Sequence, residues 1–195
     1  VMLKPYQKPH PPIICTVVVP YSKGLVAAAS RGWQPITANF LQPVWAKTHW
    51  NSYVEGCSKG GFTPDPAHWR VAKSIFVADD DATAQRYAKT VEGPYGFYFF
   101  NLMTKRMARG QADIYKHDLN MPDADVTVEY ALDRLVIAGS VNSVVDQILA
   151  FREKVGDFGT LMYPCHDWMD PALGKRSMQL MAEQVLPRVN AALKA

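Results

Sequence analysis

Short apolar runs alternate with longer segments of helical periodicity along this chain. The runs that predict strands lie near residues 12–19, 34–40, 69–78 and 160–163. Each run is followed by a segment that predicts a helix, and this alternation indicates parallel strands joined by right-handed crossovers. The predicted fold class is therefore α/β, either an open doubly wound sheet or part of an eight-stranded barrel.

Two of the predicted strands carry specific expectations. Residues 13–19 are almost entirely apolar and rich in β-branched side chains, so we expect a strand that is buried on both faces. Residues 69–78 alternate between two sets of side chains, both partly apolar, and are predicted as one continuous strand. Residues 136–138, in contrast, are expected only to link two helices.

Capping residues and periodic apolar positions predict the helices. These helices span residues 22–31, 43–57, 126–135, 141–155 and 171–192, and another begins at Asp79-Asp80-Asp81 and runs to residue 89. Pro187 is expected to kink the last one. We interpret the acidic run as a helix cap rather than a metal site, because carboxylates stabilise the first turn of a helix.

The segment of residues 92–125 interrupts the alternation. Residues 97–103 are strongly aromatic and predicted to be helical, while the rest of the segment is polar. A connection of roughly 35 residues is longer than a compact domain needs and is usually functional, for example as a lid or a channel wall. Phe97 and Phe100 are therefore candidates for lining an apolar substrate channel, although aromatic residues at helical spacing are more often core.

Tyr21-Ser22-Lys23-Gly24 forms a polar turn between the first strand and the first helix. In α/β proteins such a turn faces ligands, because N–H groups at the start of a helix attract anions. The hydroxyl of Ser22 and the charge of Lys23 suit a phosphate group. The alternative is that Ser22 is only the N-cap of the helix.

Composition narrows the class of protein. The 195 residues are 48% hydrophobic and 20% charged, which is typical of a globular domain. A net charge of +3, spread along the chain, gives no basic patch for nucleic acid. The three cysteines form neither a disulfide framework nor a metal-binding pair, which favours a reducing, cytoplasmic location. No apolar run is long enough to cross a membrane.

Several motifs, taken in order, resemble one protein family. They are residues 4–13 (KPYQKPHPPI), Val19-Pro20-Tyr21-Ser22 before an alanine-rich helix, residues 70–84, Gly139-Ser140 with its helix, and residues 177–187. Together they resemble the C-terminal half of the bacterial luciferase-like flavin-dependent monooxygenases, within which the limonene and alkanal monooxygenases are most similar. The resemblance implies that residues 1–195 form the C-terminal half of one (β/α)8 TIM-barrel domain, with an insertion at about residues 92–125 after its seventh strand.

The resemblance also implies a chemistry. Members of this family use reduced FMN and O2, and a separate flavin reductase supplies the reduced flavin. We therefore expect oxidation of a small apolar substrate such as a terpene, ketone or aldehyde. Two alternatives remain open: a deazaflavin-dependent oxidoreductase on the same barrel, and a non-catalytic fragment that binds flavin or assists assembly.

Candidate site residues follow from the same resemblance. The expected FMN-binding residues are Val19, Tyr21, Ser22, Lys23 and Asn39. The catalytic residues are expected in the N-terminal half of the barrel, which this sequence lacks, and no metal is expected. His49 is interpreted as a packing or surface residue, and His166 and Asp167, after the last strand, as weaker candidates for a general base. An open half barrel also predicts that the missing half, or a homodimer, covers the exposed sheet.

Overall fold

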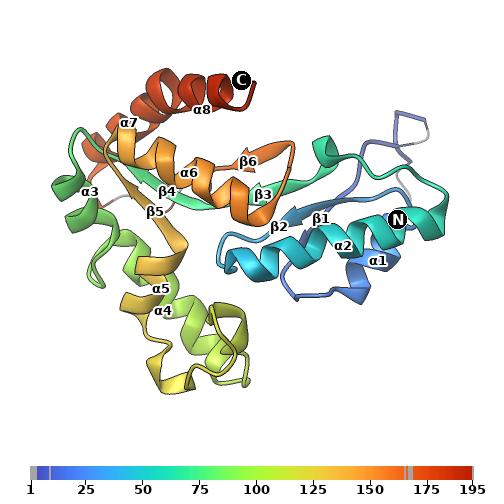
Figure 1. Ribbon diagram of the computed structural model, residues 1–195, viewed down its shortest axis with the longest axis horizontal. Helices are drawn as coiled ribbons and strands as arrows, with labels where there is room; N and C mark the ends of the chain where they lie inside the picture. Colours follow the sequence, from blue (N-terminus) through green and yellow to red (C-terminus); the bar gives the residue numbers. More distant parts are fainter. Residues whose placement is uncertain (1–3, 9, 165, 167–168, 195) are drawn as a thin grey trace.

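All strands of the computed structural model are parallel and fall into two adjoining sheets (Figure 1). The structure describes residues 4–8, 10–164, 166 and 169–194. The first sheet has the order β1-β2-β3-β6, and the second pairs β4 with β5. The strands are β1 (Ile14–Val17), β2 (Gln34–Thr37), β3 (Arg70–Ala72), β4 (Ser74–Val77), β5 (Val136–Gly139) and β6 (Thr160–Met162). The predicted α/β class with parallel strands is confirmed.

Helices follow the strands as expected, with few changes in their bounds. They are α1 (Lys23–Ala29), α2 (Pro43–Gly60), α3 (Asp81–Ala88), α4 (Pro94–Met107), α5 (Val128–Leu135), α6 (Val141–Val155), α7 (Pro171–Leu180) and α8 (Leu186–Ala192). The predicted kink near Pro187 takes the form of a π-helical stretch, Met181–Val185, between α7 and α8. Pro187 has no N–H to donate within the helix, so the backbone widens locally just before it.

The prediction of one continuous strand at residues 69–78 is wrong, because this segment forms two strands that are separated at Lys73. The first part, β3, pairs with β2 and β6, whereas the second part, β4, pairs with β5. Residues 136–139 are thus a strand and not the link we expected. The run Val136–Gly139 follows α5 without an intervening turn, so the sequence offers no boundary there.

Lys73 itself lies on the helix-facing side of this divided strand. Its ammonium group is buried, has no hydrogen-bond acceptor among the described residues, and lies 5.0 Å from the centroid of the Phe151 ring. Burial lowers the pKa of Lys73 to about 7. The apolar neighbours of Lys73 on this side, Ile75 and Val77, pack with α6 in one core cluster.

The opposite face of the first sheet is open, which contradicts the expectation that the first strand is buried on both faces. In β1, Ile14 is 44% exposed and Thr16 is exposed, whereas Val17 on the other face is buried. The register places Thr16, Ile36, Arg70 and Thr160 side by side on the open face. Nothing among the described residues covers this face, so an apolar strand remains half exposed. The barrel is not closed within the described part of the chain.

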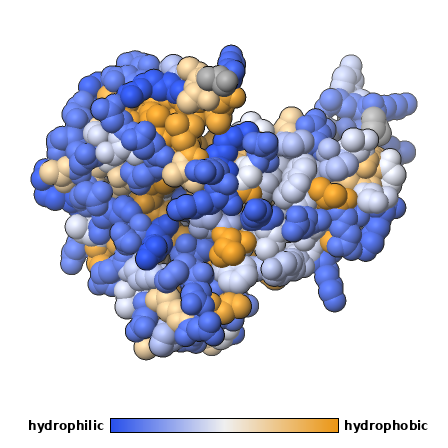
Figure 2. Space-filling model, in the orientation of Figure 1, coloured by the Kyte–Doolittle hydropathy of each residue, from blue (hydrophilic) through white to orange (hydrophobic). Residues whose placement is uncertain are grey.

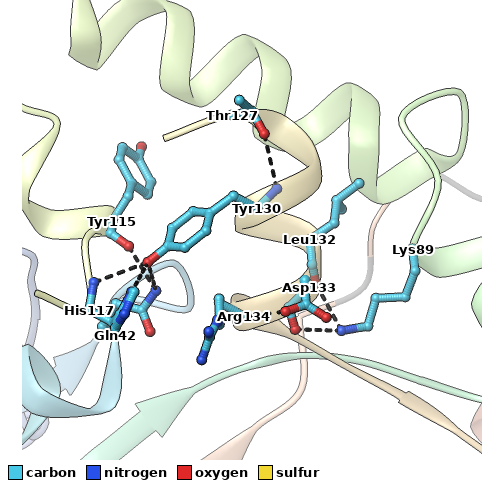
Figure 3. Close-up of polar contacts among 9 residues, drawn as sticks. All are labelled: Gln42, Lys89, Tyr115, His117, Thr127, Tyr130, Leu132, Asp133 and Arg134. Atoms are coloured by element: carbon cyan, nitrogen blue, oxygen red, sulfur yellow. Dashed lines mark hydrogen bonds and ion pairs between the residues drawn. The ribbon is translucent and has the colours of Figure 1, made fainter. Parts of the chain in front are cut away.

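Residues 92–125 contain a longer helix than predicted, α4, followed by single 3-10 turns at Asp113–Tyr115 and Asp123–Asp125. Figure 3 shows how this segment is held beside the start of α2. Gln42 Nε2 donates to the Tyr115 carbonyl at 2.7 Å, and the amide of His117 donates to the Tyr130 hydroxyl at 3.1 Å. The N-cap residue of α2 and a side chain of α5 therefore order a stretch that has little secondary structure of its own.

No helix formed by the described residues combines the length and the hydropathy needed to cross a bilayer.

Candidate functional site

The loop after β1 is held in place by two residues of α2. The backbone N–H of Tyr21 donates to Thr48 Oγ1 at 3.0 Å, and His49 Nε2 donates to the carbonyl of Val19 at 3.1 Å. Tyr21 adopts the left-handed conformation, with φ of 51°. Because that conformation is unfavourable for a tyrosine, the contact with Thr48 helps to fix a strained turn.

His49 connects this loop to the core through a chain of hydrogen bonds. Trp69 Nε1 donates to Thr37 Oγ1 at 2.9 Å, and Thr37 Oγ1 lies 3.0 Å from His49 Nδ1. In a neutral imidazole that donates from Nε2 to a carbonyl, Nδ1 accepts from the hydroxyl of Thr37. Burial lowers the pKa of His49 to about 4, which keeps it neutral at physiological pH. The interpretation of His49 as a packing residue is confirmed.

The donor groups of this loop are compatible with a phosphate. Ser22 is the N-cap of α1 and accepts from the amide of Leu25 at 3.1 Å, which leaves its hydroxyl proton available. The first N–H groups of α1 have no acceptor within the helix. However, α1 has only seven residues, so its dipole is weak and the charge of Lys23 must provide most of the attraction.

Tyr21 and Lys23 face a groove of about 660 Å³ between α1 and α2, which Glu55 and Lys59 also line. Asn39 does not line this groove. It follows β2, which pairs with β1, so Asn39 and the loop after β1 lie at the same edge of the sheet.

A second cavity, of about 460 Å³, lies where β2, α4 and the segment after β6 meet. It brings together three residues singled out in the sequence, Asn39, Phe97 and His166. Phe97 is 67% exposed at its rim, but Phe100, at 55% exposure, does not line the cavity. Neither phenylalanine is core, because the buried positions of α4 are Pro94, Tyr95, Gly96, Phe99 and Met103.

A continuous set of hydrogen bonds runs along the wall of this cavity. The Tyr98 hydroxyl donates to Asn39 Oδ1 at 3.0 Å, and Asn39 Nδ2 donates to Ser74 Oγ at 2.9 Å. Ser74 Oγ lies 3.0 Å from Nε2 of His166. These four residues come from four different parts of the chain, so only the fold assembles the network.

Aromatic rings fix the position of His166. Its ring centroid lies 4.6 Å from that of Tyr95 and 4.4 Å from that of Tyr98. The Tyr95 hydroxyl in turn donates to the carbonyl of Ile75 at 2.6 Å, and burial raises the pKa of Tyr98. The rings and hydrogen bonds together make the cavity wall rigid. Asp167, named with His166 in the sequence, lies outside the described residues.

Sequence reasoning missed Ser74 and Tyr98. Ser74 is a lone hydroxyl within a run of apolar strand residues, and that isolation is the one local signal that could have identified it. Tyr98 lies among the phenylalanines of residues 97–100, and the sequence does not show whether its hydroxyl bonds another residue or only water.

The acidic run performs the capping role predicted for it. Asp80 is the N-cap of α3 and accepts from the amide of Thr83 at 2.7 Å. Asp81 accepts from the amide of Ser140 at 2.6 Å, which joins the starts of α3 and α6, and Asp79 pairs with Arg176. Within the described ranges, no group of three or more histidine, cysteine or acidic residues is arranged to hold a metal.

Comparisons with known proteins gave sequence relatives but no match to a family model. The chain is 31% identical over 170 residues to 3,6-diketocamphane 1,6-monooxygenase of Pseudomonas putida, an alignment that covers 86% of this chain and 44% of that protein. Limonene 1,2-monooxygenase of Rhodococcus erythropolis is 25% identical over 143 residues, covering 73% of this chain and 34% of the relative.

Solved structures agree with these relatives. The oxygenating constituent of 3,6-diketocamphane monooxygenase, a type II Baeyer-Villiger monooxygenase from Pseudomonas putida solved with FMN, has a TM-score of 0.80 at 31% identity. The match covers 92% of this chain and 49% of that one. An F420-dependent secondary alcohol dehydrogenase, at 18% identity and a TM-score of 0.57, shares the fold. The chain spans about half the length of the curated relatives it matches.

Proposed function

The chain belongs to the luciferase-like flavin-dependent monooxygenases, and on this premise we propose that its protein is a two-component monooxygenase that uses reduced FMN and O2. Its substrate is a small apolar compound such as a terpene, a ketone or an aldehyde. The observation that carries the proposal is the likeness to an FMN-bound monooxygenase at 31% identity and a TM-score of 0.80. The apolar cavity beside Asn39 and His166 supports it, because small ligands bind in cavities of this size.

Reduced FMN, when bound, supplies the activation of oxygen, and the protein supplies binding, orientation and the exclusion of water. We propose that Lys23 and the Ser22 hydroxyl hold the phosphate group of FMN, while Val19 and Tyr21 shape the loop around it. The loop fits this role through its donors and its charge, as the neutral His49 and Thr48 anchor it to α2. The catalytic residues that act on the flavin are expected outside these 195 residues.

The proposed partners follow from the two-component chemistry and from the open sheet. A flavin reductase delivers the reduced FMN. The N-terminal half of the barrel covers the open face of the first sheet, and the complete protein forms a homodimer. We place the protein in the cytoplasm, where the described cysteines, Cys15 and Cys57, remain thiols.

The direct test is oxygenation by the full-length protein. Supplied with FMN, a flavin reductase, NADH and O2, it should oxygenate a cyclic terpene or ketone, with the product identified by mass spectrometry. Binding of the deazaflavin cofactor in place of FMN would overturn the proposal in favour of an oxidoreductase on the same fold. Failure to bind either flavin would leave a non-catalytic protein.

Lys23→Ala should weaken FMN binding by about tenfold to a hundredfold, because a charge-assisted hydrogen bond to phosphate contributes on the order of 1.5–3 kcal/mol. Fluorescence titration of FMN measures the change, and its dependence on salt should decrease along with the affinity. The matched control is Lys175→Ala, an exposed lysine on α7, which should bind FMN as the parent does. Equal affinity in all three proteins would remove the loop after β1 from the flavin site.

A further inference from the structure

The cavity beside α4 has an apolar wall and a polar corner, and the polar residues Asn101, Lys105 and His166 also line it. Pro94, Phe97, Leu102 and Pro164 supply the apolar wall. Asn39 and the hydroxyl of Tyr98 form the corner, with their bonded atoms 3.0 Å apart. A few fixed polar groups in a mostly apolar cavity determine the orientation and identity of a ligand.

The hydrogen-bonding capacity of this corner is only partly used. The amide nitrogen of Asn39 carries two hydrogens, and one of them goes to Ser74. The proton of Tyr98 goes to Asn39 Oδ1. One amide hydrogen of Asn39 therefore has no acceptor among the described residues, and the Tyr98 oxygen keeps lone pairs. Asn39 lines the cavity although it is only 9% exposed.

The orientation of Asn39 is fixed from both ends of its amide. Ser74, which receives one of its hydrogens, is completely buried. Tyr98 is fixed in turn, since its ring packs against His166. Because these neighbours hold the amide in place, the remaining N–H is pre-organised and little entropy is lost when it bonds a ligand.

We propose that Asn39, held by Ser74 and Tyr98, recognises the carbonyl oxygen of a small apolar substrate, so that this cavity selects ketones or aldehydes over hydrocarbons of the same shape. This inference rests on the proposed monooxygenase function. A carbonyl oxygen only accepts hydrogen bonds, which matches the amide hydrogen left at the corner. A hydrocarbon leaves that buried N–H unpaired when it displaces water, and an unpaired buried donor costs about 1–3 kcal/mol.

The test compares a cyclic ketone with the hydrocarbon of the same carbon skeleton in the full-length protein with FMN. Asn39→Asp keeps the size of the side chain and its acceptors but removes the donor, and Tyr98→Phe keeps the ring and removes the hydroxyl. Asn39→Asp should raise the KM for the ketone about tenfold, the worth of one hydrogen bond, and change the KM for the hydrocarbon less than twofold. Tyr98→Phe should also raise the KM for the ketone, but less strongly, because it removes a contact that holds the Asn39 amide in place and leaves the amide donor itself intact.

Two controls separate recognition from other effects. Asn142→Asp makes the same chemical change on the surface, where Asn142 accepts from Arg188, and should leave both KM values unchanged. The FMN affinity of Asn39→Asp should equal that of the parent. A loss of FMN affinity without a change in ketone preference would overturn the inference and make Asn39 a flavin contact, and equal losses for both substrates would assign it a structural role.

A direct measurement of ketone binding tests the inference independently of the proposed reaction. If the parent protein does not oxygenate anything, the proposed function fails, but calorimetric titration with the ketone and with the hydrocarbon still measures recognition. The parent should then bind the ketone about tenfold more tightly than the hydrocarbon, and Asn39→Asp should abolish the difference. Equal binding of the two compounds by the parent overturns the inference.

Discussion

His49 links the chemistry of one residue to the stability of the whole protein. It is completely buried, and its folded pKa of about 4 lies below the ordinary value of 6.5. Between these values the unfolded chain binds a proton that the folded protein does not. The stability that neutral His49 provides is therefore complete above pH 6.5 and is lost as the pH falls toward 4.

We expect the free energy of unfolding to fall by about 2 kcal/mol between pH 7 and pH 5. Urea denaturation at the two pH values measures the difference. In His49→Gln, which keeps a donor for the Val19 carbonyl but cannot titrate, the difference should largely disappear. An equal slope in the variant would mean that another group titrates in this range.

Lys73, at the break between β3 and β4, and Ser74, the first residue of β4, have very different surroundings. Ser74 accepts a hydrogen bond from Asn39, which lines the cavity, whereas Lys73 faces the helices and lies over Phe151. Strand periodicity predicts that they point to opposite faces. It does not predict that a lysine is buried with no described residue accepting from its ammonium group, because that depends on the packing of α6 against the strand.

At the scale of the elements, the close approach of α3 and α6 depends on Gly139. This glycine ends β5, where Asp81 of α3 accepts from the amide of Ser140. A Cβ atom at Gly139 would lie 2.7 Å from Ser143 Cβ and 2.8 Å from Asp81 Oδ1. The Cβ of Ser143 is fixed to the backbone of α6, and Asp81 can move away only by giving up its hydrogen bond with the amide of Ser140.

Gly139→Ala should therefore destabilise the protein by about 1–3 kcal/mol, as overpacking generally does. Thermal unfolding followed by circular dichroism measures the loss. The comparison is Gly24→Ala in the first turn of α1, where the nearest atom to a new Cβ lies at 3.6 Å, an ordinary contact. That variant should remain within about 0.5 kcal/mol of the parent. A Gly139→Ala variant of unchanged stability would show that α3 and α6 can separate at little cost.

At the scale of the whole molecule, the dominant feature is the open face of the first sheet. The helices α1 and α2 lie together on one side of the strands (Figure 1). The other side carries Ile14 and Thr16 in solvent. In the view of Figure 2, apolar residues reach the surface in several patches between hydrophilic ones. Exposed apolar sheet surface of this kind favours association with another part of a protein.

This open face makes the proposed missing half of the barrel testable. In a background with the native cysteines replaced, Thr16→Cys should react rapidly with a maleimide in the 195-residue chain and at least about tenfold more slowly in the full-length protein. Ser58→Cys, on an exposed position of α2, should react rapidly in both. Rapid labelling of Thr16→Cys in the full-length protein would mean that the face stays open to solvent.

The sequence by itself determined the alternation of strands and helices, the cap of α1 at Ser22, the capping role of Asp80 and the family to which the chain belongs. The elements and caps depend on local rules, since side-chain periodicity and capping act over a few residues. The family follows from the order of its motifs along the chain, which can be read without the structure. Burial, strand pairing and the cavity depend instead on which distant segments meet. Local patterns therefore could not predict the exposed β1, the division at Lys73 or the strand at residues 136–139.

The candidate site divides in the same way. Asn39 and Phe97 were identifiable as polar or aromatic residues at the ends of predicted elements, and the structure places both on one cavity. Ser74 and Tyr98 became visible only when the fold joined them to Asn39 across sequence separations of 35 and 59 residues. The residues of this hydrogen-bond network are close in space but distant in sequence. They have no common local pattern, so no periodicity along the chain could predict the network.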